Sequence, residues 1–115
     1  MLENRRFWSG EVEVIENRQV AVGTWRLAFR CPEIARSFAP GQFVMLRLPG
    51  RSDPLLGRPL AIYDVGDDEH ADRYSPTSVA IGYLVVGRGT TLMTKLRPGD
   101  VVEAWGPLGL PFPSI

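Results

Sequence analysis

The chain has 115 residues, of which 44% are hydrophobic, and its 13 basic residues are balanced by 13 acidic ones. This length predicts one soluble domain with a real core, and the zero net charge excludes a global field that recruits nucleic acid or anionic membrane. A single cysteine excludes an internal disulfide or a multi-cysteine metal site. The chain has no apolar run long enough to span a membrane and no apolar core of a signal peptide. A cytoplasmic location is therefore expected.

The first third predicts two strands followed by a loop. Residues 10–19 alternate weakly between polar and apolar, which indicates a strand with one wet face. Within Val20–Arg30, Gly23 is expected to turn the chain, and apolar side chains then recur at period two. Residues 31–41 carry two prolines and a glycine, so they predict a loop, with one helical turn around 33–36.

The middle of the chain predicts two more strands and a polar excursion. Residues 42–48 are nearly all apolar and lie between two Pro-Gly pairs, which favours a short strand buried on both faces. Arg58–Tyr63 predicts a further strand. Asp64–Pro76 holds five acidic residues and His70, and is expected to be a solvated loop; its carboxylates match no known metal-loop spacing, so no metal site is predicted.

The last third predicts a long strand, a short helix and a final strand. Thr77–Val86 is rich in β-forming residues, Thr90–Leu96 fits two helical turns, and Val101–Trp105 is expected to be the last strand. Six strands and one short helix, without a repeating strand–helix–strand rhythm, predict an all-β fold. We expect a six-stranded antiparallel Greek-key barrel, because closure removes exposed strand edges.

Two stretches carry residue types that bind phosphate. Arg58, between Gly57 and Pro59, offers a guanidinium that can hold pyrophosphate oxygens in a bidentate manner. Gly87-Arg88-Gly89-Thr90 breaks a strand and opens a helix, whose N-terminal amides attract an anion; Thr90 or Thr91 is expected to cap it. Each stretch also has an ordinary interpretation, as an exposed arginine in a turn and as a plain strand-to-helix connection.

Catalytic side chains are not predicted. The one histidine lies in the acidic loop, and no serine–histidine or cysteine–histidine couple stands out. Tyr83 could stack on a cofactor, although a strand tyrosine more often packs in a core.

Four landmarks occur in an order that resembles the flavin-binding barrel of the ferredoxin–NADP reductase-like superfamily, and within it most the electron-transfer subunits of bacterial dihydroorotate dehydrogenase. The resemblance covers roughly residues 10–110. The landmarks are Pro40-Gly41-Gln42-Phe43, Arg58-Pro59-Leu60-Ala61-Ile62, Tyr83-Leu84-Val85-Val86-Gly87-Arg88-Gly89-Thr90, and Leu96-Arg97-Pro98-Gly99-Asp100 running on to Gly106-Pro107-Leu108-Gly109.

The resemblance implies FAD as cofactor and assigns its contacts. It implies that Arg58 contacts the pyrophosphate, and that Gly89 and Thr90 direct backbone and hydroxyl donors at phosphate. Ala61 stands where a serine or threonine is usual, so a hydroxyl bond to the flavin ring is missing. The residues implied to line the isoalloxazine are Pro59, Leu60 and Ala61, and those implied to face the flavin and ribityl chain are Gly82, Tyr83 and Leu84.

The resemblance also implies a longer parent protein. Residues 1–115 are then one FAD-binding domain, an excised N-terminal fragment that lacks the NAD(P)-binding domain and the [2Fe–2S] region. The parent passes electrons between NAD(P)H and an iron–sulfur centre, with the dihydroorotate dehydrogenase catalytic subunit as partner in pyrimidine biosynthesis. The isolated domain is expected to have no turnover.

Two alternatives remain open at this stage. A small barrel can bind single-stranded nucleic acid or a protein partner without any flavin, using a basic face; the candidate arginines are Arg26, Arg30, Arg47 and Arg88. The other alternative is a reductase of the same superfamily with a different acceptor, such as a hydrogenase subunit or an oxygenase.

Overall fold

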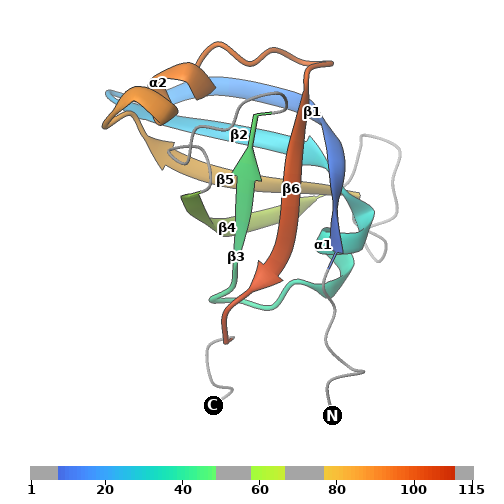
Figure 1. Cartoon of the computed structure of the whole chain (residues 1–115). Coiled ribbons are helices and arrows are strands. Elements are labelled where there is room, and N and C mark those ends of the chain that lie inside the picture. The colour runs from blue at the N-terminus through green and yellow to red at the C-terminus, as the bar shows by residue number, and fades with distance from the viewer. Residues whose placement is uncertain (1–7, 49–57, 67–76, 111–115) are drawn as a thin grey trace.

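The computed structural model describes residues 8–48, 58–66 and 77–110, which form one β-barrel with two short helices (Figure 1). Within these ranges the elements in chain order are β1 Trp8–Ala21, β2 Thr24–Arg30, α1 Pro32–Ser37, β3 Phe43–Arg47, β4 Arg58–Gly66, β5 Ser78–Leu84, α2 Arg88–Met93 and β6 Val101–Leu108.

Every strand pairs with two neighbours, so the sheet closes on itself. The order around the barrel is β1-β2-β5-β4-β3-β6, and the pairing of β6 with β1 completes the ring. All the pairings are antiparallel. The mostly β, antiparallel fold expected from the sequence is confirmed. Closure shortens the exposed edges, although residues 58–61 of β4 pair only with β3 and residues 82–84 of β5 pair only with β2.

The β1–β2 hairpin confirms the first two strands. Gly23 turns the chain with φ +69, a conformation that favours glycine. Leu27 and Phe29 then point into the barrel with 0% exposure, and Trp25 packs partly buried against the same core. The period-two pattern of this segment therefore identified its inner face correctly.

An irregularity in β1 changes which residues face inward. Val12 and Val14 are buried, but the pairing with β2 shifts between Val14 and Glu16. After this shift Asn17 lies opposite Leu27, a buried core residue. Because paired residues of antiparallel strands project from the same face, the bulge brings Asn17 to the interior side.

The expectation that residues 42–48 are buried on both faces is wrong. β3 alternates instead: Val44 and Leu46 are buried, Phe43 and Met45 are half-buried, and Arg47 is exposed. Closure into a barrel explains the difference, since only one face of each strand then meets the core.

Three strands are longer than predicted: β1, which spans Trp8–Ala21 and not 10–19, and also β4 and β6. β4 continues through Asp64 to Gly66, so the first residues of the expected acidic loop belong to a strand. The rest of that loop, residues 67–76, lies outside the described residues, as does the loop expected at 51–56. β6 continues through Gly106 and Pro107, which were expected to end it. Both are buried, Gly106 pairs with Trp8, and Leu108 after them pairs with Phe43.

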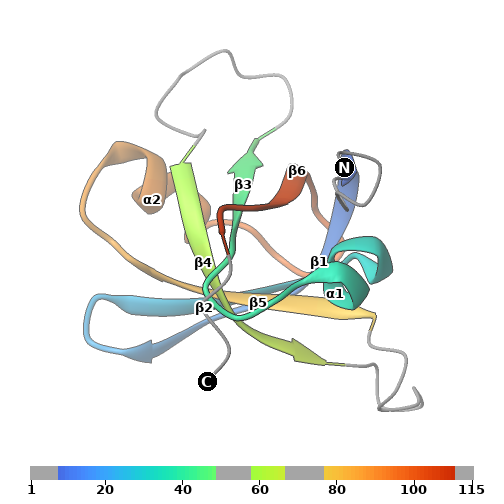
Figure 2. The same cartoon turned by 90° about the horizontal axis from the view of Figure 1, so that it is seen from below.

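The helices lie on different sides of the barrel, as Figures 1 and 2 both show. α1 forms at the predicted helical turn. Cys31 precedes it as N-cap and is buried, and burial raises the pKa of its thiol to about 11, so the thiolate is scarce at neutral pH. Within the described part of the chain, no helix has the length and apolar character needed to cross a membrane.

Candidate functional site

The predicted phosphate-binding stretches lie toward the same end of the barrel. β4 pairs antiparallel with β5, from Ile62 opposite Ile81 to Gly66 opposite Ser78. This direction turns the start of β4, where Arg58 lies, toward the same end as the last residues of β5, from which the chain continues into α2, although residues 58–61 pair with β3 and not with β5. Figure 1 shows α2 beside the turn of the β1–β2 hairpin, and Figure 2 shows it on the same side of the barrel as the start of β4.

The start of α2 differs from the expected one. The helix begins at Arg88, with Gly87 as N-cap, so Thr90 lies inside the first turn and does not cap the helix as the preceding residue. Its side chain reaches back: Thr90 Oγ1 accepts from the amides of Val86 (2.9 Å) and Gly87 (3.1 Å) and donates to the Gly87 carbonyl (3.2 Å). Thr90 is 5% exposed. Its hydroxyl therefore builds the turn, and any contact with phosphate is left to the backbone.

The two glycines of this turn do not use a left-handed conformation. Gly87 is extended at φ −177, and Gly89 is not among the described glycines with positive φ. A Cβ atom added at Gly87 would meet no protein atom within 4 Å. The fold therefore gives no steric reason for glycine at position 87, and the open space beside its backbone is compatible with close approach of a ligand.

An anionic ligand fits this end of the barrel chemically. Arg88, Gly89 and Thr90 form the first turn of α2, whose backbone N–H groups have no carbonyl partner within a helix. No acidic residue lies in this first turn. The residues present thus fit a phosphate-bearing group better than a cation.

The three consecutive positions predicted on β5 do not share one face. Gly82 and Leu84 are exposed, Leu84 by 60%, whereas Tyr83 between them is 4% exposed and belongs to the core. The Tyr83 ring stacks on Trp25 with centroids 6.4 Å apart. A ligand on the outer face would reach Gly82 and Leu84, while Tyr83 would act from beneath.

The predicted positions on β4 pair with β3. Arg58 lies opposite Leu46, Pro59 opposite Met45, Leu60 opposite Val44 and Ala61 opposite Phe43. Leu60 is buried in the hydrophobic core, so its side chain serves the fold.

Asn17 is a polar residue near this site that the sequence did not single out. Its side chain lies partly buried, accepts a hydrogen bond from Tyr83 and donates two to the end of α2. An asparagine in a weakly alternating strand carries no such signal, because the bulge in β1 decides which way it points.

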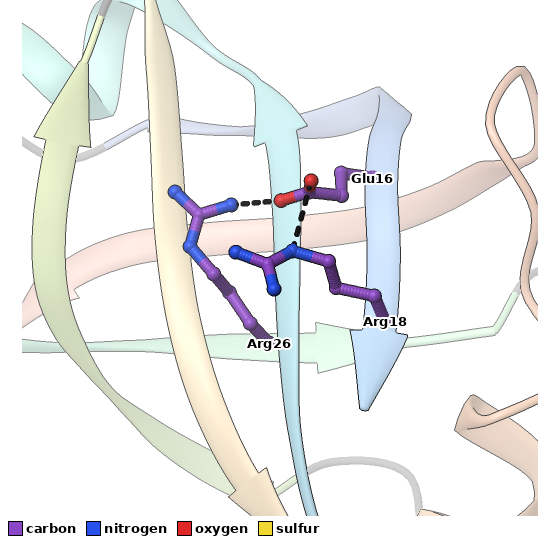
Figure 3. Close-up of polar contacts among 3 residues, drawn as sticks. All are labelled: Glu16, Arg18 and Arg26. Carbon is purple, nitrogen blue, oxygen red and sulfur yellow. Dashed lines mark hydrogen bonds and ion pairs between the residues drawn. The ribbon is translucent and has the colours of Figure 1, made fainter. Parts of the chain in front are cut away.

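Two of the four arginines of the basic face proposed as an alternative, Arg26 and Arg47, are paired with carboxylates. Figure 3 shows Arg26 and Arg18 converging on the carboxylate of Glu16, with which both form ion pairs. Arg47 pairs with Glu103 at 2.7 Å and lies over the Trp105 ring. Guanidinium groups engaged by carboxylates are poor partners for nucleic-acid phosphates, so the nucleic-acid alternative has no support.

A surface groove of about 450 Å³ lies on another wall of the barrel, formed by β1, β6 and β3. None of the predicted site residues lines it. Its lining residues are Ser9, Gly10, Glu11, Arg47, Glu103, Ala104 and Trp105.

Curated relatives are electron transfer subunits of one enzyme. The chain is 37% identical over 108 residues to the "Dihydroorotate dehydrogenase B (NAD(+)), electron transfer subunit" of Desulforamulus reducens, covering 90% of this chain and 38% of that protein. The protein of the same name from Clostridium acetobutylicum is 36% identical over 100 residues, covering 87% of this chain and 35% of the relative. The chain thus spans little more than a third of the length of these relatives.

Solved structures share the fold. An NADH-dependent reduced ferredoxin-NADP oxidoreductase superposes with a TM-score of 0.74 at 23% identity, covering 89% of this chain and 34% of that one. The ferredoxin reductase of carbazole 1,9a-dioxygenase superposes with a TM-score of 0.63 at 19% identity, covering 90% of this chain and 30% of that one. No family model matches the chain.

Proposed function

We propose that this chain is the FAD-binding barrel of an electron-transfer flavoprotein. The premise is that the chain is homologous to part of the electron transfer subunit of dihydroorotate dehydrogenase B. One observation carries this proposal: β4 and β5 run antiparallel, so the start of β4 and the start of α2 lie toward the same end of the barrel. A guanidinium and a set of helix amides then converge on one diphosphate. The strand order β1-β2-β5-β4-β3-β6 supports the Greek-key connection expected for this class of barrel.

The residues divide into phosphate and flavin contacts. Arg58 binds the pyrophosphate through its guanidinium, and Gly89 and Thr90 bind it through their backbone amides. Gly82 and Leu84 offer the exposed face of β5 to the flavin and ribityl chain, whereas Tyr83 supports that face from the core. The isoalloxazine contacts are assigned to the β4 residues Pro59, Leu60 and Ala61. Because the Leu60 side chain is buried in the core, Leu60 contributes through its backbone.

FAD, when bound, supplies the chemistry: it accepts two electrons together and releases them singly. The chain supplies position and electrostatics, and no side chain in the described part is assigned a catalytic role. We infer that in a full-length parent the electrons pass between NAD(P)H and a [2Fe–2S] cluster, which other parts of the protein hold. The buried Cys31, the one cysteine in the sequence, cannot ligate such a cluster.

The remaining expectations follow from the same premise. The domain is the N-terminal part of a longer cytoplasmic protein, whose partner is the dihydroorotate dehydrogenase catalytic subunit in pyrimidine biosynthesis. The name of the relatives, electron transfer subunit of dihydroorotate dehydrogenase B, supports the partner. Because the other wall of the flavin cleft lies outside this chain, the domain alone binds FAD weakly and does not turn over.

A titration of the purified chain with FAD tests the proposal. We expect saturable quenching of flavin fluorescence with a stoichiometry of about one per chain, and a shifted flavin absorption spectrum. A single-stranded oligonucleotide is the matched probe for the rejected alternative and is expected to give no salt-dependent binding. Absence of saturable FAD binding by a folded chain contradicts the proposal.

Gly87→Ser separates a role for Gly87 in the fold from a role in binding. Serine is a better N-cap than glycine and adopts φ −177 freely, so the free energy of unfolding should stay equal or rise by a few tenths of a kcal/mol. The added side chain enters the space beside the backbone, and FAD affinity should fall about tenfold, which corresponds to about 1.4 kcal/mol. Urea unfolding and the fluorescence titration measure the two quantities.

Gly99→Ser is the matched control. Gly99 has φ +95, so serine there is strained and should cost about 1 kcal/mol of stability while leaving FAD affinity unchanged. Equal FAD affinity for Gly87→Ser and the unmodified chain would mean that no ligand approaches this glycine.

A further inference from the structure

Helix α2 is too short to hold its own position. It spans six residues, Arg88–Met93, and an isolated helix of this length is unstable in water. Its placement must therefore come from contacts with the barrel. Met93 anchors it on the apolar side, being buried in the core. Val85 before the helix and Leu96 after it pack partly buried against the same core. Polar contacts add to these apolar anchors and direct the end of the helix.

Asn17 supplies the polar contact at the end of α2. Its Nδ2 donates to the Met93 carbonyl at 2.8 Å and to the Leu96 carbonyl at 3.1 Å. Carbonyls at the C-terminal end of a helix have no partner within the helix. The Met93 carbonyl, at the end of α2, also accepts from the Leu96 amide at 3.1 Å, and the Leu96 carbonyl lies just beyond the helix. Asn17 therefore ties the end of α2 and the turn after it to β1, across a sequence separation of more than 70 residues.

Tyr83 determines which way the Asn17 amide points. The Tyr83 hydroxyl donates to Asn17 Oδ1 at 3.0 Å, which directs the amide nitrogen of Asn17 at the helix carbonyls. Burial raises the pKa of Tyr83 to about 12, so the phenol keeps its proton and its donor role at neutral pH. Stacking on Trp25 holds the Tyr83 ring in place.

The same network reaches the segment that faces the ligand. Tyr83 lies on β5 next to the exposed Leu84, and the chain continues through Val86 and Gly87 into α2. Val85 is held by its amide, which donates to the Gly23 carbonyl at 2.9 Å. One end of segment 85–93 is thus tied to the hairpin turn, and the other end is tied to Asn17.

We propose that Asn17 is a positioning residue for FAD: its two hydrogen bonds, oriented by Tyr83, hold segment 85–93 where its backbone meets the cofactor phosphates. This inference rests on the proposed function, which assigns the phosphates to that segment. Asn17 itself does not touch the ligand. Its effect is on the phosphate-bearing part of the cofactor and not on the flavin ring.

Two nearly isosteric variants of the full chain test this role. Asn17→Asp keeps the acceptor for Tyr83, loses both donors and places a negative charge at a helix C-terminus, which is unfavourable. Tyr83→Phe keeps the ring and its stacking and removes only the orienting hydroxyl. We expect the Kd for FAD to rise about tenfold or more in Asn17→Asp and two- to fivefold in Tyr83→Phe. The Kd for riboflavin, which has no phosphate, should change less than twofold.

The control variant is Thr94→Ala. It removes another hydrogen bond at the end of α2, from Thr94 Oγ1 to the Thr91 carbonyl at 2.6 Å, without touching Asn17. We expect it to leave the FAD affinity unchanged. A variant that merely loosens the whole fold would weaken FAD and riboflavin in parallel, and that result overturns the proposal.

Amide hydrogen exchange without ligand keeps this test separate from the proposed function. In Asn17→Asp the amides of Val86, Gly87 and Thr91 should exchange at least about tenfold faster, while β2 amides keep their protection. Unchanged exchange at α2 overturns the positioning role even when FAD binds. If the α2 amides of Asn17→Asp exchange faster but the unmodified chain binds no FAD, Asn17 does hold α2 in place. The proposed function is then rejected, and the cofactor role of Asn17 is rejected with it.

Discussion

Arg58→Ala is expected to lower FAD affinity by about 10- to 100-fold, the largest effect of any single change on binding. A hydrogen bond to a charged group contributes about 1.5–3 kcal/mol, and each 1.4 kcal/mol corresponds to a factor of ten in Kd. Arg58 opens β4 opposite Leu46, at the end of the barrel where α2 begins. Titration of flavin fluorescence for the variant and the unmodified chain measures the loss.

Two companion variants identify the cause of that loss. Arg58→Lys keeps the charge but not the bidentate geometry, so an intermediate Kd is expected. Arg47→Ala removes an arginine from the neighbouring strand β3, where it pairs with Glu103, and should leave FAD affinity within about twofold. If both alanine variants weaken binding equally, net charge and not a specific contact holds the cofactor.

Phe29→Ala is expected to lower the free energy of unfolding by about 3–5 kcal/mol. Phe29 is 0% exposed on β2, between Val14 on β1 and Val79 on β5, both of which are also buried. Small domains have a total stability of about 5–15 kcal/mol, so the variant should be partly unfolded at room temperature. Urea denaturation followed by far-UV circular dichroism measures the change in midpoint.

Val22→Ala is the matched control for the core. Val22 is 97% exposed at the hairpin turn, and its truncation should change stability by less than about 0.5 kcal/mol. A Phe29→Ala protein with an unchanged midpoint would mean that the barrel interior does not pack around β2.

Local pattern was a reliable guide where one strand face meets the core and the other meets solvent. The alternation of Trp25, Leu27 and Phe29 identified β2 and its inner face, and the helical turn expected around 33–36 is part of α1. Composition misled at β3, because an apolar run looks the same whether it is buried on one face or on two. Turn residues misled at β6, which carries Gly106 and Pro107 within a paired strand.

The candidate site could be predicted only in part. The motif around Arg58 and the turn at Gly87–Thr90 contain the residue types that bind phosphate, whereas the strand order places both stretches toward the same end of the barrel. Thr90 was expected to donate to a ligand, but its hydroxyl donates to the Gly87 carbonyl. A hydroxyl that lies within reach of backbone groups in its own turn forms hydrogen bonds with those groups in preference to a ligand. The residue type alone does not reveal that the backbone groups are within reach.

By itself, the sequence determined the β-strand content and the turn at Gly23, because these depend on residues that are close in the chain; the phosphate role of Arg58 stays a prediction. Only the tertiary structure decided the role of Asn17. Simple alternation from Val12 and Val14 would place Glu16 inside and Asn17 outside, but the bulge in β1 reverses this order. A one-residue shift in pairing exchanges the two faces of a strand, and that shift is chosen by the packing of β1 against β2 and α2, not by β1 alone.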